Sequence, residues 1–95
     1  MAERQEISRQ LCQSLIQASI GTLLPDDIRR ILTEISEQLD VIVKLEDGKL
    51  AAYGDGDITN AYLVIISRIY EDLKVKIGTR QARSFAIKAL SLIHI

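Results

Sequence analysis

The chain has few of the residues that most often carry chemistry. Its 95 residues contain no tryptophan, one proline, one cysteine and one histidine. A lone cysteine forms no internal disulfide and supplies at most one thiolate to a metal, so a disulfide framework and a cysteine-rich metal site are both excluded. Cys12 is therefore interpreted as a small apolar residue on a helix.

Aromatic residues are also scarce, which limits what the core can contain. One phenylalanine and three tyrosines are present, yet 47% of the residues are hydrophobic and 26% are charged. This composition is ordinary for a globular protein and argues against disorder. The core must be built from Ile, Leu, Val and Ala. A chain this short buries only about 60–65% of its unfolded surface, so a partner chain is often needed to complete the core.

Long apolar runs are missing as well. No stretch approaches the roughly 18–20 apolar residues that span a bilayer. The charged N-terminus is not followed by an apolar run of signal-peptide length. The sequence therefore predicts a cytoplasmic protein with no membrane partner.

The charges are distributed unevenly around a net charge of −1. Residues 26–57 hold nine acids and four bases, whereas residues 68–88 hold six bases and two acids. This asymmetry suits head-to-tail association, although two solvated faces are the more ordinary interpretation. A chain that is slightly acidic overall is a poor match for nucleic acid, which stays a minor alternative. The basic contact patch predicted here comprises Lys74, Lys76, Arg80, Arg83 and Lys88.

Hydrophobic spacing predicts a helical hairpin at the start of the chain. Apolar residues recur every three or four positions over residues 3–22, and again over residues 25–39. Pro25 lies where helices accept proline, and Asp26 and Asp27 place negative charge at the positive end of the second helix dipole.

The pattern then changes to that of a β-hairpin. Residues 40–45 are rich in β-branched side chains, and residues 50–53 can return as a second strand. Asp47 and Gly48 lie between them, and Asp-Gly between two apolar runs is a strong hairpin signal. Two strands alone are marginally stable, so the hairpin must lie on helices or pair with further strands.

A long apolar helix is predicted over residues 58–77, with Asp57 as its N-cap. Its apolar arc is wider than one stripe, which predicts burial on more than one side. Gly78 and Thr79 end it and begin a short fourth helix that reaches Ala89. The fold class is thus α+β and mostly helical, with residues 1–89 forming one small domain or the N-terminal part of a larger one. The surplus apolar side chains predict a contact surface made of Tyr62, Ile65, Ile66, Ile69, Tyr70 and Leu73.

No motif in the sequence names a reaction, and none predicts a cofactor or a metal. Counted from Asp55 as a calcium loop, the sixth position is Asn60 and the twelfth is Ile66, so the template fails. No phosphate-binding glycine pattern occurs. The serines have no adjacent base. An enzyme complete within these residues is disfavoured.

The order of elements over residues 26–78 resembles the front half of a roadblock/LC7-type module. There a hairpin such as residues 41–53 precedes a long helix, as it does here. The resemblance covers a little over half of the chain and assigns no role to any single residue. It implies a non-enzymatic module that dimerises and regulates small GTPases or motor and signalling complexes. The family continues into three more strands, whereas residues 79–89 here predict a helix.

Two functions are compatible with these observations. The first is a regulatory or scaffold module that dimerises or binds a protein partner through the long helix and the edge of the hairpin. The alternative is an N-terminal sensory or regulatory segment of a larger signalling protein or enzyme whose catalytic part lies elsewhere.

The last six residues, 90–95, resemble a sequencing artefact. Leu-Ser-Leu-Ile-His-Ile is the translation of CTG TCT CTT ATA CAC ATC, which resembles the end of a transposon adapter used to prepare sequencing libraries. We therefore expect a non-native tail, and His94 loses its standing as a candidate catalytic or metal-binding residue.

The genomic reading frame tests this expectation. On an assembled contig, the native frame should continue past Ala89 with residues that differ from the present hexapeptide. A full-length homologue that ends in the same six residues would contradict it.

Overall fold

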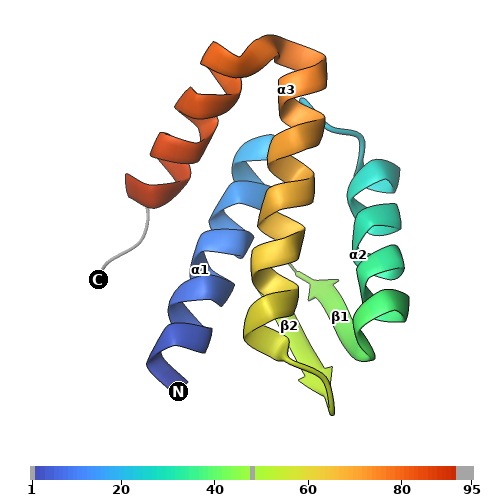
Figure 1. Cartoon of the computed structure of the whole chain (residues 1–95). Helices are drawn as coiled ribbons and strands as arrows, with labels where there is room; N and C mark the ends of the chain where they lie inside the picture. Colours follow the sequence, from blue (N-terminus) through green and yellow to red (C-terminus); the bar gives the residue numbers. More distant parts are fainter. Residues whose placement is uncertain (1, 48, 92–95) are drawn as a thin grey trace.

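Three helices and one β-hairpin make up the part of the chain that the structure describes, residues 2–47 and 49–91 of a computed structural model. Their order is α1 (Ala2–Ser19), α2 (Pro25–Leu39), β1 (Val41–Glu46), β2 (Lys49–Gly54) and α3 (Ile58–Ser91). Figure 1 shows this arrangement. The predicted α+β, mostly helical fold is confirmed.

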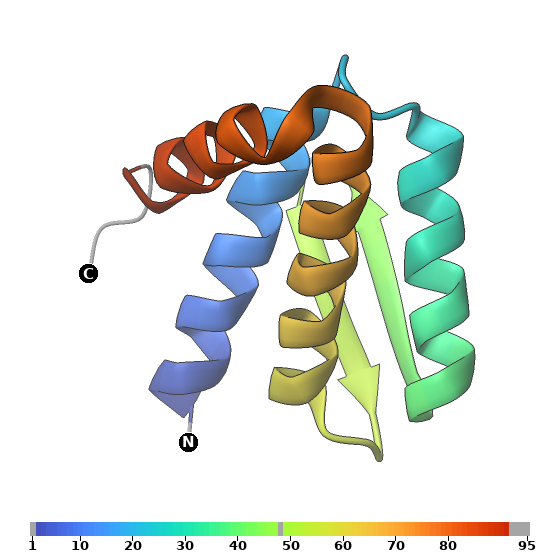
Figure 2. The same ribbon diagram turned by 45° about the horizontal axis from the view of Figure 1, so that its top comes forward.

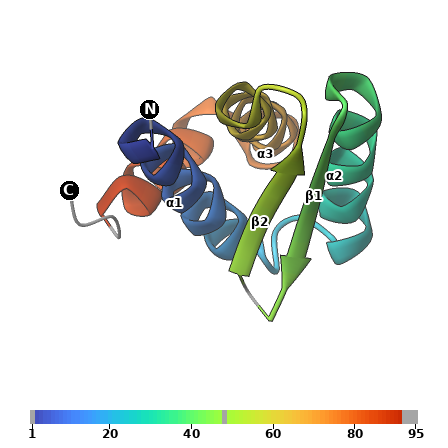
Figure 3. The ribbon, with the colours of Figure 1, turned by 90° about the horizontal axis from the view of Figure 1, so that it is seen from below.

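The hairpin covers one face of a layer of helices. In Figures 1 and 3, α3 lies between α1 and α2, and both strands lie on the same side of this layer. The strands pair antiparallel, with Val41 opposite Gly54 and Glu46 opposite Lys49. Val43 and Leu50 are buried on the helix side, because successive side chains of a strand point to opposite faces.

The first half of α3 forms the centre of the core. Tyr62, Ile65, Ile69 and Leu73 are fully or almost fully buried there. The other helices, the turn between them, the hairpin and three alanines of α3 supply the rest, and most of it is aliphatic, as the scarcity of aromatics predicts. Its members are Cys12, Leu15, Ile16, Leu23, Ile28, Ile31, Leu32, Ile35, Val41, Val43, Leu50, Ala61, Ala82 and Ala89.

Local signals place the helix starts where the sequence predicts them. Pro25 is the first residue of α2, and two aspartates occupy its first turn. Asp57 caps α3, because its Oδ1 accepts a hydrogen bond from the backbone N–H of Asn60 at 3.1 Å. Asp47 has the positive φ, 52°, that a two-residue hairpin turn requires. Gly48, the other predicted turn residue, lies outside the described residues.

The first helix is shorter than predicted. It ends at Ser19 rather than at residue 22. The backbone N–H groups of Thr22 and Leu23 both donate to the carbonyl of Ser19, at 3.0 and 2.8 Å. This tight turn passes through Gly21, whose φ is +99°, and it directs Leu23 into the core. Burying the side chain of Leu23 therefore stabilises the fold more than one more turn of α1 would.

Gly78 divides α3 into the two predicted helices. Its φ of 84° and ψ of 162° are not helical. Residues 79–91, the C-terminal segment of α3, fold back against α1 (Figure 2) and bury Ala82 and Ala89. The predicted tail begins within this helix, and its last four residues, 92–95, lie outside the described residues.

None of the helices in the described ranges is both long and apolar enough to cross a bilayer.

Gly56 is predicted to be the least replaceable glycine in the connector before α3. A Cβ at this position would overlap the carbonyl oxygen of Leu39 and lie 2.9 Å from Cγ1 of Val41. Gly56→Ala should lower the free energy of unfolding in urea by about 1–3 kcal/mol, the usual cost of overpacking. Asp55→Ala, at the exposed neighbouring position, is the control and should change little. Equal unfolding midpoints for the two variants would contradict this packing.

Candidate protein-interaction site

The outer edges of the two hairpin strands carry backbone groups that need hydrogen-bond partners. The described sheet has only two strands, so each strand has one edge whose backbone groups point away from its partner. Such edges find hydrogen-bond partners within the molecule, bond with water, or pair with another chain. An edge is closed where its backbone groups have partners within the chain, and it is open where they have none.

The edge of β2 is closed by side chains from α1 and α3. The backbone N–H of Leu50 donates to Oε1 of Gln13 at 3.0 Å, and its carbonyl accepts from Nη1 of Arg9 at 3.4 Å. Two residues along, the backbone of Ala52 is hydrogen-bonded to the phenol of Tyr62. Burial raises the pKa of this phenol, and the hydrogen bond with Ala52 and the charge of Arg9 oppose that rise.

The edge of β1 is closed only near its start. The backbone N–H of Val43 donates to Oγ of Ser36 at 3.1 Å, and Ser36 in turn donates to the carbonyl of Leu32 at 2.8 Å. Side chains of α2 thus protect the first half of this edge, close to the point where α2 leads into β1.

Leu45, two residues further along β1, exposes an open edge. It lies opposite Leu50, whose N–H points away from β1 toward Gln13. Residues opposite each other in an antiparallel pair point their backbone groups either both inward or both outward, so the N–H and C=O of Leu45 also point outward. Among the described residues, none forms a hydrogen bond to either group.

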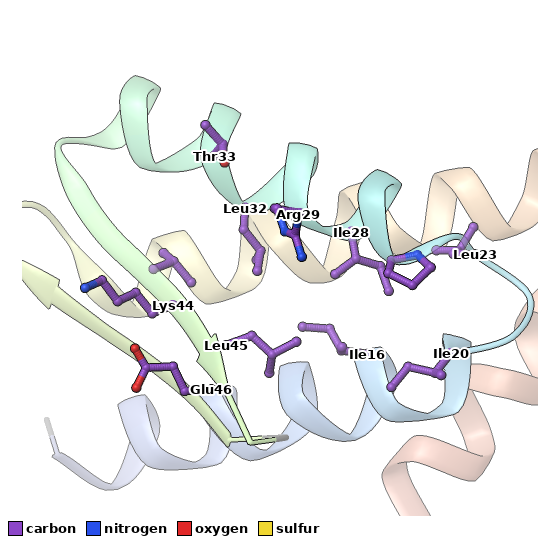
Figure 4. A pocket seen from close by; sticks show the side chains of 12 residues that line it. Ile16, Ile20, Leu23, Ile28, Arg29, Leu32, Thr33, Lys44, Leu45 and Glu46 are labelled. Carbon is purple, nitrogen blue, oxygen red and sulfur yellow. The ribbon is translucent and has the colours of Figure 1, made fainter.

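A groove opens beside this free edge. Figure 4 shows α2 and β1 diverging from their connection, with the end of α1 below them. The space between them, the α2–β1 groove, has a volume of about 380 Å³. Its lining consists of Ile16, Ile20, Leu23, Pro25, Ile28, Arg29, Leu32, Thr33, Val43, Lys44, Leu45 and Glu46.

The groove has an apolar floor and a charged rim. Ile28 and Leu32 point from α2 toward Ile16 and Leu45 (Figure 4), while Lys44 lies at the rim. A hydrogen bond with Tyr53 and the nearby charge of Glu46 raise the pKa of Lys44, so its ammonium stays charged at neutral pH. An apolar floor rimmed by charge is typical of a surface that binds another polypeptide.

Neither a cysteine nor a serine is among the described residues that line this groove. Cys12 is fully buried in the core, and burial raises the pKa of its thiol to about 12, so it is protonated and unreactive at neutral pH. Ser19 is buried too, and its hydroxyl donates to the carbonyl of Leu15 at 2.7 Å. No three potential metal ligands come together within residues 2–47 and 49–91.

The structure narrows the contact surface predicted on the third helix. Tyr62, Ile65, Ile69 and Leu73 are buried by the chain's own elements, because α3 lies between α1 and α2. These four side chains are inaccessible to a partner in the folded chain. Ile66 and Tyr70 are half-buried and border a smaller hollow, of about 230 Å³, beneath the C-terminal segment of α3.

The predicted basic patch is divided by the bend at Gly78. Before the bend, the ammonium of Lys74 lies 3.4 Å from Glu71, and that of Lys76 lies 3.6 Å from Asp27. The remaining members are exposed on the C-terminal segment of α3, and they are Arg80, Arg83 and Lys88. The five cations therefore do not form one continuous site.

The groove itself is absent from the sequence-based predictions. Its lining comes from three successive elements and the turn between the first two, and it forms only when they pack together, so no local pattern identifies it. The one available signal is the short hairpin, which requires the helices to cover its edges.

Comparison of this chain with protein-family models, with curated proteins and with solved structures finds no match. The resemblance to a roadblock/LC7-type module therefore stays a prediction.

Closure of the β2 edge can be tested by removing its main acceptor. Gln13→Ala leaves the N–H of Leu50 without its partner, which should lower the free energy of unfolding by about 1–2 kcal/mol. Gln10→Ala is the matched control, because Gln10 lies on the same helix and donates to Glu6 at 3.3 Å. Equal unfolding midpoints in urea for both variants would show that Gln13 does not stabilise this edge.

Proposed function

We propose that this chain is a non-enzymatic regulatory or scaffold module that acts through protein–protein association. The observation that carries the proposal is the α2–β1 groove, where an apolar floor lies next to unpaired backbone groups of Leu45. Apolar side chains favour burial by a partner, and free strand-edge groups favour another strand. Both features lie at the same end of the hairpin.

Exposed apolar side chains on the turn after α1 and on the outer face of the hairpin support the proposal. Ile20 and Leu24, in and beside the turn between α1 and α2, are 61% and 62% exposed. Ile42 and Tyr53 lie opposite each other on the outer face of the hairpin, and each is about half exposed. A small domain gains stability by covering such side chains, which favours a partner or a second copy.

The resemblance over residues 26–78 favours the same function, since roadblock/LC7-type modules dimerise and regulate other proteins. A cytoplasmic location fits this role and stays a prediction.

Replacing Ile20 tests whether association uses the groove. Sedimentation velocity over a wide concentration range should show that the unmodified protein self-associates and that Ile20→Arg stays monomeric, because the arginine brings an uncompensated charge onto apolar surface. Ile87→Arg is the matched control: Ile87 is 60% exposed on the C-terminal segment of α3 and should tolerate the change. An unmodified protein that stays monomeric at millimolar concentration would contradict self-association through this surface.

A further inference from the structure

We propose that two copies of this chain join by antiparallel pairing of their β1 edges, centred on Leu45, to form one four-stranded sheet. This inference rests on the proposed function and specifies its partner and its contact. The backbone of β1, the charges beside it and the adjacent groove support this pairing.

Leu45 lies at an open stretch of the β1 edge. Val43, Leu50 and Ala52 already bond with side chains of the helices, whereas the outward N–H and C=O of Leu45 have no partner among the described residues. Pairing about a two-fold axis at Leu45 lets each copy donate its N–H to the other's carbonyl, so one contact satisfies all four groups.

The charges beside Leu45 match this register. When the two Leu45 residues lie opposite each other, Lys44 of one copy faces Glu46 of the second, and the reverse pair forms by symmetry. Both side chains are exposed on the outer face of the sheet. A register centred on residue 44 or 46 would instead place two lysines or two glutamates opposite each other. Opposite charges across adjacent strands stabilise pairing and like charges oppose it, so the sequence selects the Leu45 register.

The groove accommodates the side chain that this pairing brings in. Neighbouring residues on paired strands point to the same face, and Leu45 points to the helix side. Leu45 of the second copy would thus lie beside its counterpart and beneath the first half of α2. The apolar side chains of Ile28 and Leu32 project into this space (Figure 4).

The shape of the molecule confines pairing to the end of β1. Nearer its start, the N–H of Val43 is taken by Ser36, and α2 lies close to the strand. Toward Glu46 the two elements diverge around the α2–β1 groove. The contact is therefore short, and the exposed Ile20 and Leu24 lie at the end of the molecule where the two copies meet.

A charge exchange at residues 44 and 46 distinguishes this dimer from other uses of the same edge. Lys44→Glu and Glu46→Lys each replace two attractive pairs by two repulsive ones and should weaken dimerisation roughly tenfold or more. The double variant restores opposite charges in the reversed order and should recover the affinity of the unmodified protein. Arg83→Glu, at an exposed position on the C-terminal segment of α3 and away from the hairpin, is the control and should dimerise normally. Far-ultraviolet circular dichroism verifies that each variant is folded.

Sedimentation of these variants gives outcomes that separate the inference from the proposed function. Recovery in the double variant supports β1-to-β1 pairing. A dimer that Ile20→Arg disrupts but all four charge variants leave unchanged overturns the pairing and leaves the proposed function standing. A monomer that binds an extended peptide of another protein at this edge overturns the pairing as well. If the unmodified protein neither dimerises nor binds such a peptide, both proposals fail.

Discussion

Every backbone N–H and C=O on the outer edge of a strand needs a hydrogen-bond partner, and a two-stranded hairpin has two such edges. In this molecule the helices supply the partners. Gln13 and Arg9 of α1 and Tyr62 of α3 bond with the edge of β2, while Ser36 of α2 bonds with the edge of β1. These contacts link all three helices to the hairpin, in addition to the core that they share.

The same constraint explains why association is proposed at one place. At Leu45, near its end, β1 has diverged from the helix that protects its edge, and this divergence leaves an apolar groove. Open backbone groups and uncovered apolar side chains thus occur together, since both result from the same divergence. A second strand placed there would satisfy the polar groups and bury the apolar ones in one contact.

Local signals in the sequence predict the elements well, because caps, turns and hydrophobic spacing act over a few residues. Pro25, Asp57 and Gly78 each mark a boundary that the structure has. The candidate site is less predictable. A broadly apolar helix such as residues 58–77 suits either a partner surface or the centre of a core, and only tertiary packing, which buries Tyr62 and Leu73, distinguishes the two.

The most direct test of this account is amide hydrogen exchange at the edge residues of the hairpin, measured at several protein concentrations. Val43, Leu50 and Ala52 should be protected at every concentration, because their partners belong to the same chain. Leu45 should be protected only where the protein is concentrated enough to dimerise. Fast exchange at Leu50 and Ala52, or protection of Leu45 that does not change on dilution, would contradict the account.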